Sequence, residues 1–162
     1  MRIITISREF GSGGRELGKR LADVTGCDYY DNEIISAVAK NIGISSDYVD
    51  RTLSNHGWQN LSITYRGTLS SNSYLYAAQV QLLVEQKKVI EQIAALGKDC
   101  IIVGRNADMI LQEYAPFNLF VCAQTEAKVK RCMERASAEE KLTEKELIRK
   151  MKQVDKVRSQ TR

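Results

Sequence analysis

The residues with the clearest chemical signal lie near the amino terminus, in the run Ser7-Arg8-Glu9-Phe10-Gly11-Ser12-Gly13-Gly14-Arg15-Glu16. An apolar stretch, residues 3–6, precedes this run, and apolar residues at helical spacing follow it, so the run joins a predicted strand to a predicted helix. Three glycines in four positions let the backbone turn tightly and direct successive N–H groups toward one point. The positive end of the following helix also attracts anions. An ordinary turn of this kind needs one glycine, so the pattern favours a phosphate-binding loop.

Two further turns carry residues that could bind a ligand. Asp31 and Asn32 follow a short predicted strand at 27–30, and Arg105 follows Gly104 after the very apolar strand 100–103. Ligands of parallel α/β sheets bind beyond the carboxyl ends of the strands, so we expect these turns to lie close to the glycine loop. Asp31 is equally typical of a helix N-cap. Arg105 is also compatible with a surface ion pair to Asp108.

Strands and helices are predicted to alternate along the chain, with a fourth strand at 118–122. The first helix is expected to end at Gly26, the second to follow residues 31–32, and the third to span 74–96 before Gly97. A short helix is expected around 109–111, the next to be capped by Thr125, and the last to follow a capping box of Thr143 and Glu146. Continuous apolar strands between helices indicate a parallel sheet covered on both faces, an α/β fold with three layers. Residues 54–73 are rich in Ser, Asn, Gly and Thr and are predicted to form a flexible loop on the substrate side.

Composition limits the class of protein. The chain has 162 residues, 43% of them hydrophobic, which suits one domain over 1–162 with its own core. The four cysteines show no C-x-x-C spacing and there is one histidine, so neither a disulfide framework nor a zinc cluster is expected. No apolar run is long enough to span a membrane, and the first residues do not resemble a signal peptide. A cytoplasmic protein without a membrane partner is the natural expectation.

The net charge of +4 comes from the last quarter of the chain. Residues 126–162 hold twelve basic and seven acidic side chains. No aromatic residue follows Phe120, whereas a nucleic-acid surface usually mixes clustered basic residues with aromatic ones. We therefore expect no nucleic-acid partner. Two interpretations stay open for this segment: a solvated helical face, or a mobile basic arm that closes over an anionic substrate.

The run ITISREFGSGGRELGKRLA resembles the cytidylate kinase-like family, a branch of the P-loop nucleoside-monophosphate kinases, and the resemblance continues through YYDNEIISAVA, IIVGRNAD and VDKVR. Against the pattern G-x-x-x-x-G-K-[S/T], Arg8 falls on the first glycine, Gly13 on the second, Gly14 on the lysine and Arg15 on the hydroxyl residue. The lysine that contacts the donor phosphates and the hydroxyl that holds Mg²⁺ are thus both missing. The resemblance also implies five strands, so the four found here suggest that the carboxyl-terminal strand is absent from this chain.

The resemblance implies an ATP-dependent phosphotransferase that uses Mg²⁺ and acts on a nucleoside monophosphate. The donor phosphates would be bound by Gly11, Ser12, Gly13, Gly14, Arg15 and Glu16, with Arg8 and Arg15 supplying charge. Glu16 could also reach Mg²⁺, or serve simply as a first-turn acid favoured by the helix dipole. The acceptor would contact Asp31, Asn32, Arg105 and Asp155, and a lid-like helical region at 137–162 would supply Arg158 and Arg162.

Two alternative functions and the oligomeric state stay open at this point. The chain could be a nucleotide-binding regulatory module that has lost catalysis, because the loop lysine is missing. It could also be a kinase for a small molecule that is not a nucleotide. Association of the chain into a homo-oligomer is possible as well.

Overall fold

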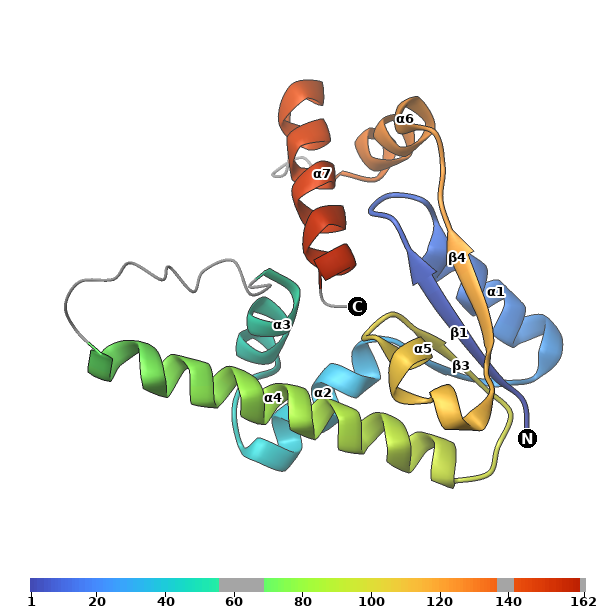
Figure 1. The fold of residues 1–162 in the computed structure, drawn as a ribbon. Coiled ribbons are helices and arrows are strands. Elements are labelled where there is room, and N and C mark those ends of the chain that lie inside the picture. Colours follow the sequence, from blue (N-terminus) through green and yellow to red (C-terminus); the bar gives the residue numbers. More distant parts are fainter. Residues whose placement is uncertain (56–68, 137–141, 161–162) are drawn as a thin grey trace.

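The computed structural model describes residues 1–55, 69–136 and 142–160. The elements, in chain order (Figure 1), are β1 (Ile3–Arg8), α1 (Gly14–Thr25), β2 (Asp28–Tyr30), α2 (Asn32–Ile42), α3 (Ser46–Asn55), α4 (Leu69–Ala95), β3 (Cys100–Val103), α5 (Ala107–Ile110), the 3₁₀ turn η2 (Gln112–Tyr114), β4 (Phe117–Val121), α6 (Thr125–Arg135) and α7 (Glu144–Gln160). Strands and helices alternate as the sequence predicts.

The sheet contains four parallel strands among the described residues, in the order β2-β3-β1-β4. Ile3 of β1 is paired with Cys100 of β3, and Ile4 is paired with Phe117 of β4. The strand β3 is buried along its whole length because it lies between β2 and β1 and is covered on both faces. This arrangement confirms the α/β fold predicted from the apolar strands.

Helices cover both faces of the sheet, and alternate residues of β3 show how. Ile101 and Val103 belong to the cluster that includes Ile6 and Ala22, the latter from α1. Cys100 and Ile102 belong to the larger cluster on the opposite face, which is built mainly from α2 and α4. Successive side chains of a strand point to opposite faces, so one short apolar strand serves both layers of helices.

The last two helices lie at the carboxyl end of β1 and β4, above the loop that follows β1 (Figure 1). They form a small third core from Val129, Leu147 and Met151, against which Phe10 of the glycine loop packs. The predicted capping box begins α7, since the Thr143 hydroxyl and the Thr143 N–H both donate to Glu146, over 2.7 and 2.9 Å. The glycine loop is therefore packed against the carboxyl-terminal quarter of the chain.

Several predicted boundaries are wrong. The predicted loop at 54–73 begins inside α3, a helix that the sequence analysis missed, and ends inside α4, which starts at Leu69. Residues 56–68 lie outside the described part of the chain. The strand β1 continues to Arg8, so Arg8 is a strand residue. Thr125 is the first residue of α6, whose N-cap is Gln124 without a side-chain hydrogen bond. Within the described ranges, every helix is too short or too polar to cross a bilayer.

Candidate functional site

A cleft of about 890 Å³ opens at the carboxyl end of β1 and β3. Of the residues predicted from the sequence, its wall contains Arg8, Gly11, Gly13, Gly14, Arg15, Glu16, Arg105, Asp155 and Arg158. The expected convergence of the glycine loop with the turn after β3 is therefore present. The binding roles of these residues stay predictions.

The other predicted residues lie off the cleft wall. The Ser12 hydroxyl donates to the Glu9 carbonyl at 2.9 Å and so closes the loop on itself. Asp31 and Asn32 are not part of the wall, but both contact Arg15, and Asp31 also lies near Arg8. Arg162 falls outside the described residues.

The glycine loop presents backbone N–H groups at the start of α1. The first hydrogen bond of the helix runs from the Leu17 N–H to the Gly13 carbonyl over 3.0 Å. The N–H groups of Gly14, Arg15 and Glu16 lie before this bond, so they have no carbonyl partner within the helix. Among the described residues, no other acceptor binds them. Such amides, with the positive end of the helix dipole behind them, are able to bind an anion, and the predicted phosphate contact of this loop stays a prediction.

Arg8 lies across the floor of the cleft, and two glycines make room for its side chain. A Cβ atom at Gly14 would lie 2.7 Å from the Arg8 Cβ, and one at Gly104 would lie 1.6 Å from Arg8 Nη1. The side chain is only 11% exposed, and its guanidinium is 3.6 Å from Asp31. Burial, reinforced by Arg158, lowers the pKa of Arg8 to about 10, and Asp31 opposes that shift. Arg8 thus keeps its positive charge at neutral pH inside the wall.

Asp31 is the counter-ion of two arginines. Its carboxylate lies 2.6 Å from Arg15 Nε and 3.6 Å from Arg8 Nη2, and the side chain is 6% exposed. Asp31 occupies the N-cap position of α2, as the sequence analysis allows, but its carboxylate makes no side-chain capping hydrogen bond to that helix. Asn32 accepts a hydrogen bond from Arg15 Nη2 at 3.2 Å. Arg15, the predicted substitute for the loop lysine, is therefore directed toward the end of β2.

The turn after β3 has an unusual backbone. Gly104, Arg105 and Asn106 have φ values of +77°, +59° and +55° in succession. Residues other than glycine rarely adopt a positive φ, and backbone strain of this kind is concentrated at functional sites. The Arg105 carbonyl accepts a hydrogen bond from Gln86 at 3.1 Å, which helps to hold the turn.

The Arg105 side chain is 9% exposed and lies 2.8 Å from Asp50. Asp50 belongs to α3, the helix that the sequence analysis did not predict. The structure thus gives Arg105 a carboxylate partner from a distant part of the chain. Its predicted role on the acceptor side stays a prediction.

Two arginines of α6, Arg131 and Arg135, also form the cleft wall, and the sequence analysis missed them. A Cβ atom at Gly13 would lie 3.1 Å from the Arg131 Cζ, so this guanidinium lies directly at the start of α1. Both arginines contact Glu16, Arg135 at 2.6 Å. Their spacing of four residues, on a helix that follows the neighbouring strand β4, was a signal that could have identified them.

Glu16 is held by three guanidinium groups, those of Arg20, Arg131 and Arg135. These contacts lower the pKa of Glu16, and the hydrogen bond with Arg135 is the largest cause. In kinase sites magnesium is usually bound through one or two carboxylates together with substrate phosphates and water. No group of three potential metal ligands occurs in the described ranges. Three guanidinium groups already pair with the Glu16 carboxylate, and they compete with any cation there, so a contact of Glu16 with Mg²⁺ stays a prediction.

Asp155 and Arg158 contact the loop and β1. Asp155 Oδ1 accepts a hydrogen bond from the Phe10 N–H at 2.6 Å, and Arg158 Nη1 donates to the Arg8 carbonyl at 3.2 Å. The two side chains lie 3.7 Å apart. Burial lowers the pKa of Arg158, and Asp155 opposes that change. These contacts fix α7 against the glycine loop, while the predicted acceptor role of Asp155 stays a prediction.

The sequence matches the cytidylate kinase-like family over residues 3–161. The chain belongs to this family. Comparison with curated proteins finds no match. This family member is similar in structure to an uncharacterized protein from Eubacterium ventriosum ATCC 27560, with 28% identity and a TM-score of 0.64 over 97% of this chain and 75% of the other.

Two more distant structures share the fold. The shikimate kinase from Bacteroides thetaiotaomicron is 12% identical, with a TM-score of 0.60 over 98% of this chain and 80% of the kinase. TT1252 from Thermus thermophilus is 18% identical, with a TM-score of 0.50 over 93% of this chain and 78% of the other. At these identities the likeness is evidence for the P-loop kinase fold alone.

Proposed function

We propose that this cytidylate kinase-like protein is an ATP-dependent phosphotransferase whose acceptor is a nucleoside monophosphate. The observation that carries the proposal is the convergence of six arginines on one cleft beside the open amides of α1. These arginines come from five parts of the chain: Arg8, Arg15, Arg105, Arg131, Arg135 and Arg158. A transferring phosphoryl group spreads charge over several oxygens, and fixed cations around it stabilise that charge.

The donor phosphates are assigned to the loop side of the cleft. The amides of Gly14 and Arg15 offer two donors, and Arg131 lies against Gly13, the residue before Gly14, which occupies the position of the missing loop lysine. A guanidinium can bind two phosphate oxygens at once, so Arg131 can supply charge and orientation together. In this assignment Arg131, rather than Arg15, supplies the charge that a P-loop lysine would provide.

The acceptor monophosphate is assigned to the opposite side, between the end of β2 and the turn after β3. Arg15 is turned toward Asp31 and Asn32 there, and Arg105 is held in the strained turn. Arg8, on the floor between the two sides, lies near both phosphates in this arrangement. Phosphoryl transfer then depends on positioning and on charge stabilisation, the usual sources of catalysis in this chemistry.

A second candidate is a nucleotide-binding module without catalysis, and one observation favours it. Arg15, Arg131 and Arg158 are each in contact with a carboxylate, respectively Asp31, Glu16 and Asp155. A polyphosphate must displace these carboxylates before all the cations can act on it. If bound ATP does not replace these carboxylates as the partner of the arginines, the protein would bind ATP without forming product.

The decisive experiment combines an assay with a binding measurement. The purified protein is incubated with ATP, Mg²⁺ and, in turn, each common nucleoside monophosphate and a set of small hydroxyl acceptors, and ADP release is followed. Calorimetry measures ATP binding on the same sample. Turnover with a monophosphate supports the proposal, and turnover only with a hydroxyl acceptor would instead indicate a small-molecule kinase. ATP binding without any ADP release would favour the regulatory module, and absence of both would contradict a nucleotide function.

A further inference from the structure

Lys128 of α6 is a buried lysine that neither the sequence analysis nor the proposed function uses. Its side chain is 10% exposed, whereas Lys130, two residues later on the same helix, is exposed. Lysine is seldom this buried unless it is paired. Lys128 does not contribute to the wall of the cleft, so it has no direct access to a bound ligand there.

The buried ammonium group lies between two carboxylates from distant segments. Lys128 Nζ is 2.9 Å from Glu9 in the glycine loop and 3.8 Å from Asp155 in α7. Glu9 accepts a further hydrogen bond from the Ala123 N–H at 3.4 Å, and Asp155 accepts the Phe10 N–H at 2.6 Å. We call Glu9, Lys128 and Asp155 the loop cluster. Through it, one ammonium group connects the glycine loop, the end of β4, α6 and α7.

The backbone of the same residue also supports the loop. A Cβ atom at Gly11 would lie 3.4 Å from both the Cβ and the carbonyl oxygen of Lys128, and 2.8 Å from Cys132 Sγ. The loop thus passes closely over this turn of α6. The hydrogen bond with Lys128 is also the largest cause of a lowered pKa at Glu9. Removing the ammonium group leaves two nearby carboxylates without their shared cation, and their repulsion acts on the loop directly.

We infer that Lys128 is a positioning residue that holds the glycine loop in its anion-binding conformation by joining it to α6 and α7. The effect on nucleotide binding rests on the proposed function. The effect on the loop itself does not, because the contacts that carry it are all between residues of the chain.

The test compares Lys128→Met, Lys128→Arg and Lys130→Met. Hydrogen–deuterium exchange of the ligand-free proteins is measured for the peptide that covers residues 7–14 and for peptides of α1 and α7. We expect Lys128→Met to speed exchange in the loop peptide by at least about tenfold, because loss of a charged partner from a buried pair typically costs more than about 1.4 kcal/mol, which is a factor of ten. Lys130→Met, which removes the same charge from the exposed face, should match the native protein, and Lys128→Arg should restore most of the protection.

ATP affinity, measured by calorimetry at a temperature where circular dichroism shows each variant folded, gives the second readout. A purely structural role would lower the melting temperature and leave the affinity of the folded molecules unchanged, whereas a positioning role weakens it about tenfold and Lys128→Arg recovers it. Unchanged loop exchange in Lys128→Met, or equally faster exchange throughout the chain, would overturn the inference. Faster loop exchange in a protein whose native form binds no ATP would support the positioning role and refute the proposed function.

If Lys128→Met fails to fold, Glu9→Gln takes its place. This variant keeps the shape of the side chain and an oxygen acceptor but loses the charge that pairs with Lys128. A smaller acceleration of exchange, confined to the loop peptide, is then expected. Exchange identical to that of the native protein would contradict the inference.

Discussion

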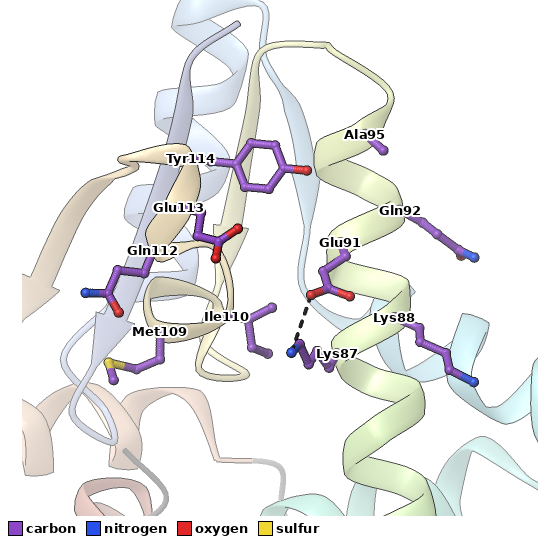
Figure 2. Close-up of a pocket in the computed structure, with 10 residues that line it drawn as sticks. All are labelled: Lys87, Lys88, Glu91, Gln92, Ala95, Met109, Ile110, Gln112, Glu113 and Tyr114. Carbon is purple, nitrogen blue, oxygen red and sulfur yellow. Dashed lines mark ion pairs between the residues drawn. The ribbon is translucent and has the colours of Figure 1, made fainter.

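Two hollows of similar size occur in this molecule, and their chemistry differs. The arginine-lined cleft measures about 890 Å³, and a groove between α4 and the segment α5–η2 measures about 800 Å³. Figure 2 shows the groove, in which Lys87 and Glu91 face each other along α4 while Tyr114 extends from the opposite wall. Volume alone therefore does not distinguish the two hollows.

The origin of the charges does distinguish them. At the groove, Lys87 pairs with Glu91 over 3.6 Å, and Lys88 pairs over 3.4 Å with Glu85, which lies outside the groove wall. All four residues belong to α4. Such pairs contribute a few tenths of a kcal/mol to a helix. In the cleft, Arg131 meets Glu16 and Arg15 meets Asp31, residues brought together only by the fold. Because its charges converge from distant segments onto open amides, the cleft is the candidate site that we propose.

The strongest test of this contrast uses two glycines with similar backbone angles. Gly104 at the cleft has φ +77°, and Gly97, after α4, has φ +70°. A Cβ atom at Gly104 would lie 1.6 Å from Arg8 Nη1, whereas a Cβ atom at Gly97 would have nothing within 4 Å. Gly97→Ala should cost about 1 kcal/mol of unfolding free energy from the backbone angle alone. Gly104→Ala should cost about 3–5 kcal/mol, because it also displaces Arg8 from its buried pair with Asp31. Urea unfolding measures both, and equal losses would show that the space for Arg8 is unimportant.

The next test compares arginine in the cleft with lysine in the groove. Arg131→Ala should weaken ATP binding about 10- to 100-fold, since hydrogen bonds to charged groups contribute about 1.5–3 kcal/mol. Lys88→Ala removes a positive charge from the groove wall and should change the ATP dissociation constant less than about twofold. Calorimetric titration of both variants decides the matter. A similar loss in both would indicate only a general effect of net charge.

The sequence predicted the strands and the loop that form the cleft better than the contacts between its charged residues. Ile6 and the run Cys100–Val103 identified the central strands, and the glycines identified the loop, because buried strands and tight turns leave local patterns. The partners of the arginines leave none. Arg131 meets Glu16 across 115 positions, so that contact follows only from where the fold places α6 relative to the first turn of α1. The helix α3 was missed because its sequence, SDYVDRTLSN, has few apolar residues.

Arg15→Ala sharpens the division within the cleft. Because Arg15 contacts Asp31 and Asn32 at 2.6 and 3.2 Å, we expect the KM for the acceptor to rise about tenfold and the ATP dissociation constant to change much less. Steady-state kinetics with the best acceptor, together with ATP calorimetry, separate the two effects. A larger loss of ATP affinity than of acceptor affinity would instead make Arg15 the substitute for the loop lysine.

The smallest expected effect concerns acid and compares Glu9 in the loop with Glu85 beside the groove. Hydrogen bonding lowers the pKa of both carboxyls, chiefly to Lys128 for Glu9 and to Asn41 for Glu85. A lowered pKa in the folded state gives stability that is present above the ordinary pKa near 4.5 and is lost as the pH falls through the folded value. As the pH falls from 7 to 3, the unfolding free energy of Glu9→Gln should therefore decrease less than that of the native protein. The difference between the two decreases should be under about 1 kcal/mol. Glu85→Gln should also make the unfolding free energy less dependent on pH.

Hydrogen exchange separates the two variants. Only Glu9→Gln should speed exchange of the loop peptide at pH 7, because only Glu9 belongs to the glycine loop. The same acceleration in Glu85→Gln would remove the distinction between the two regions.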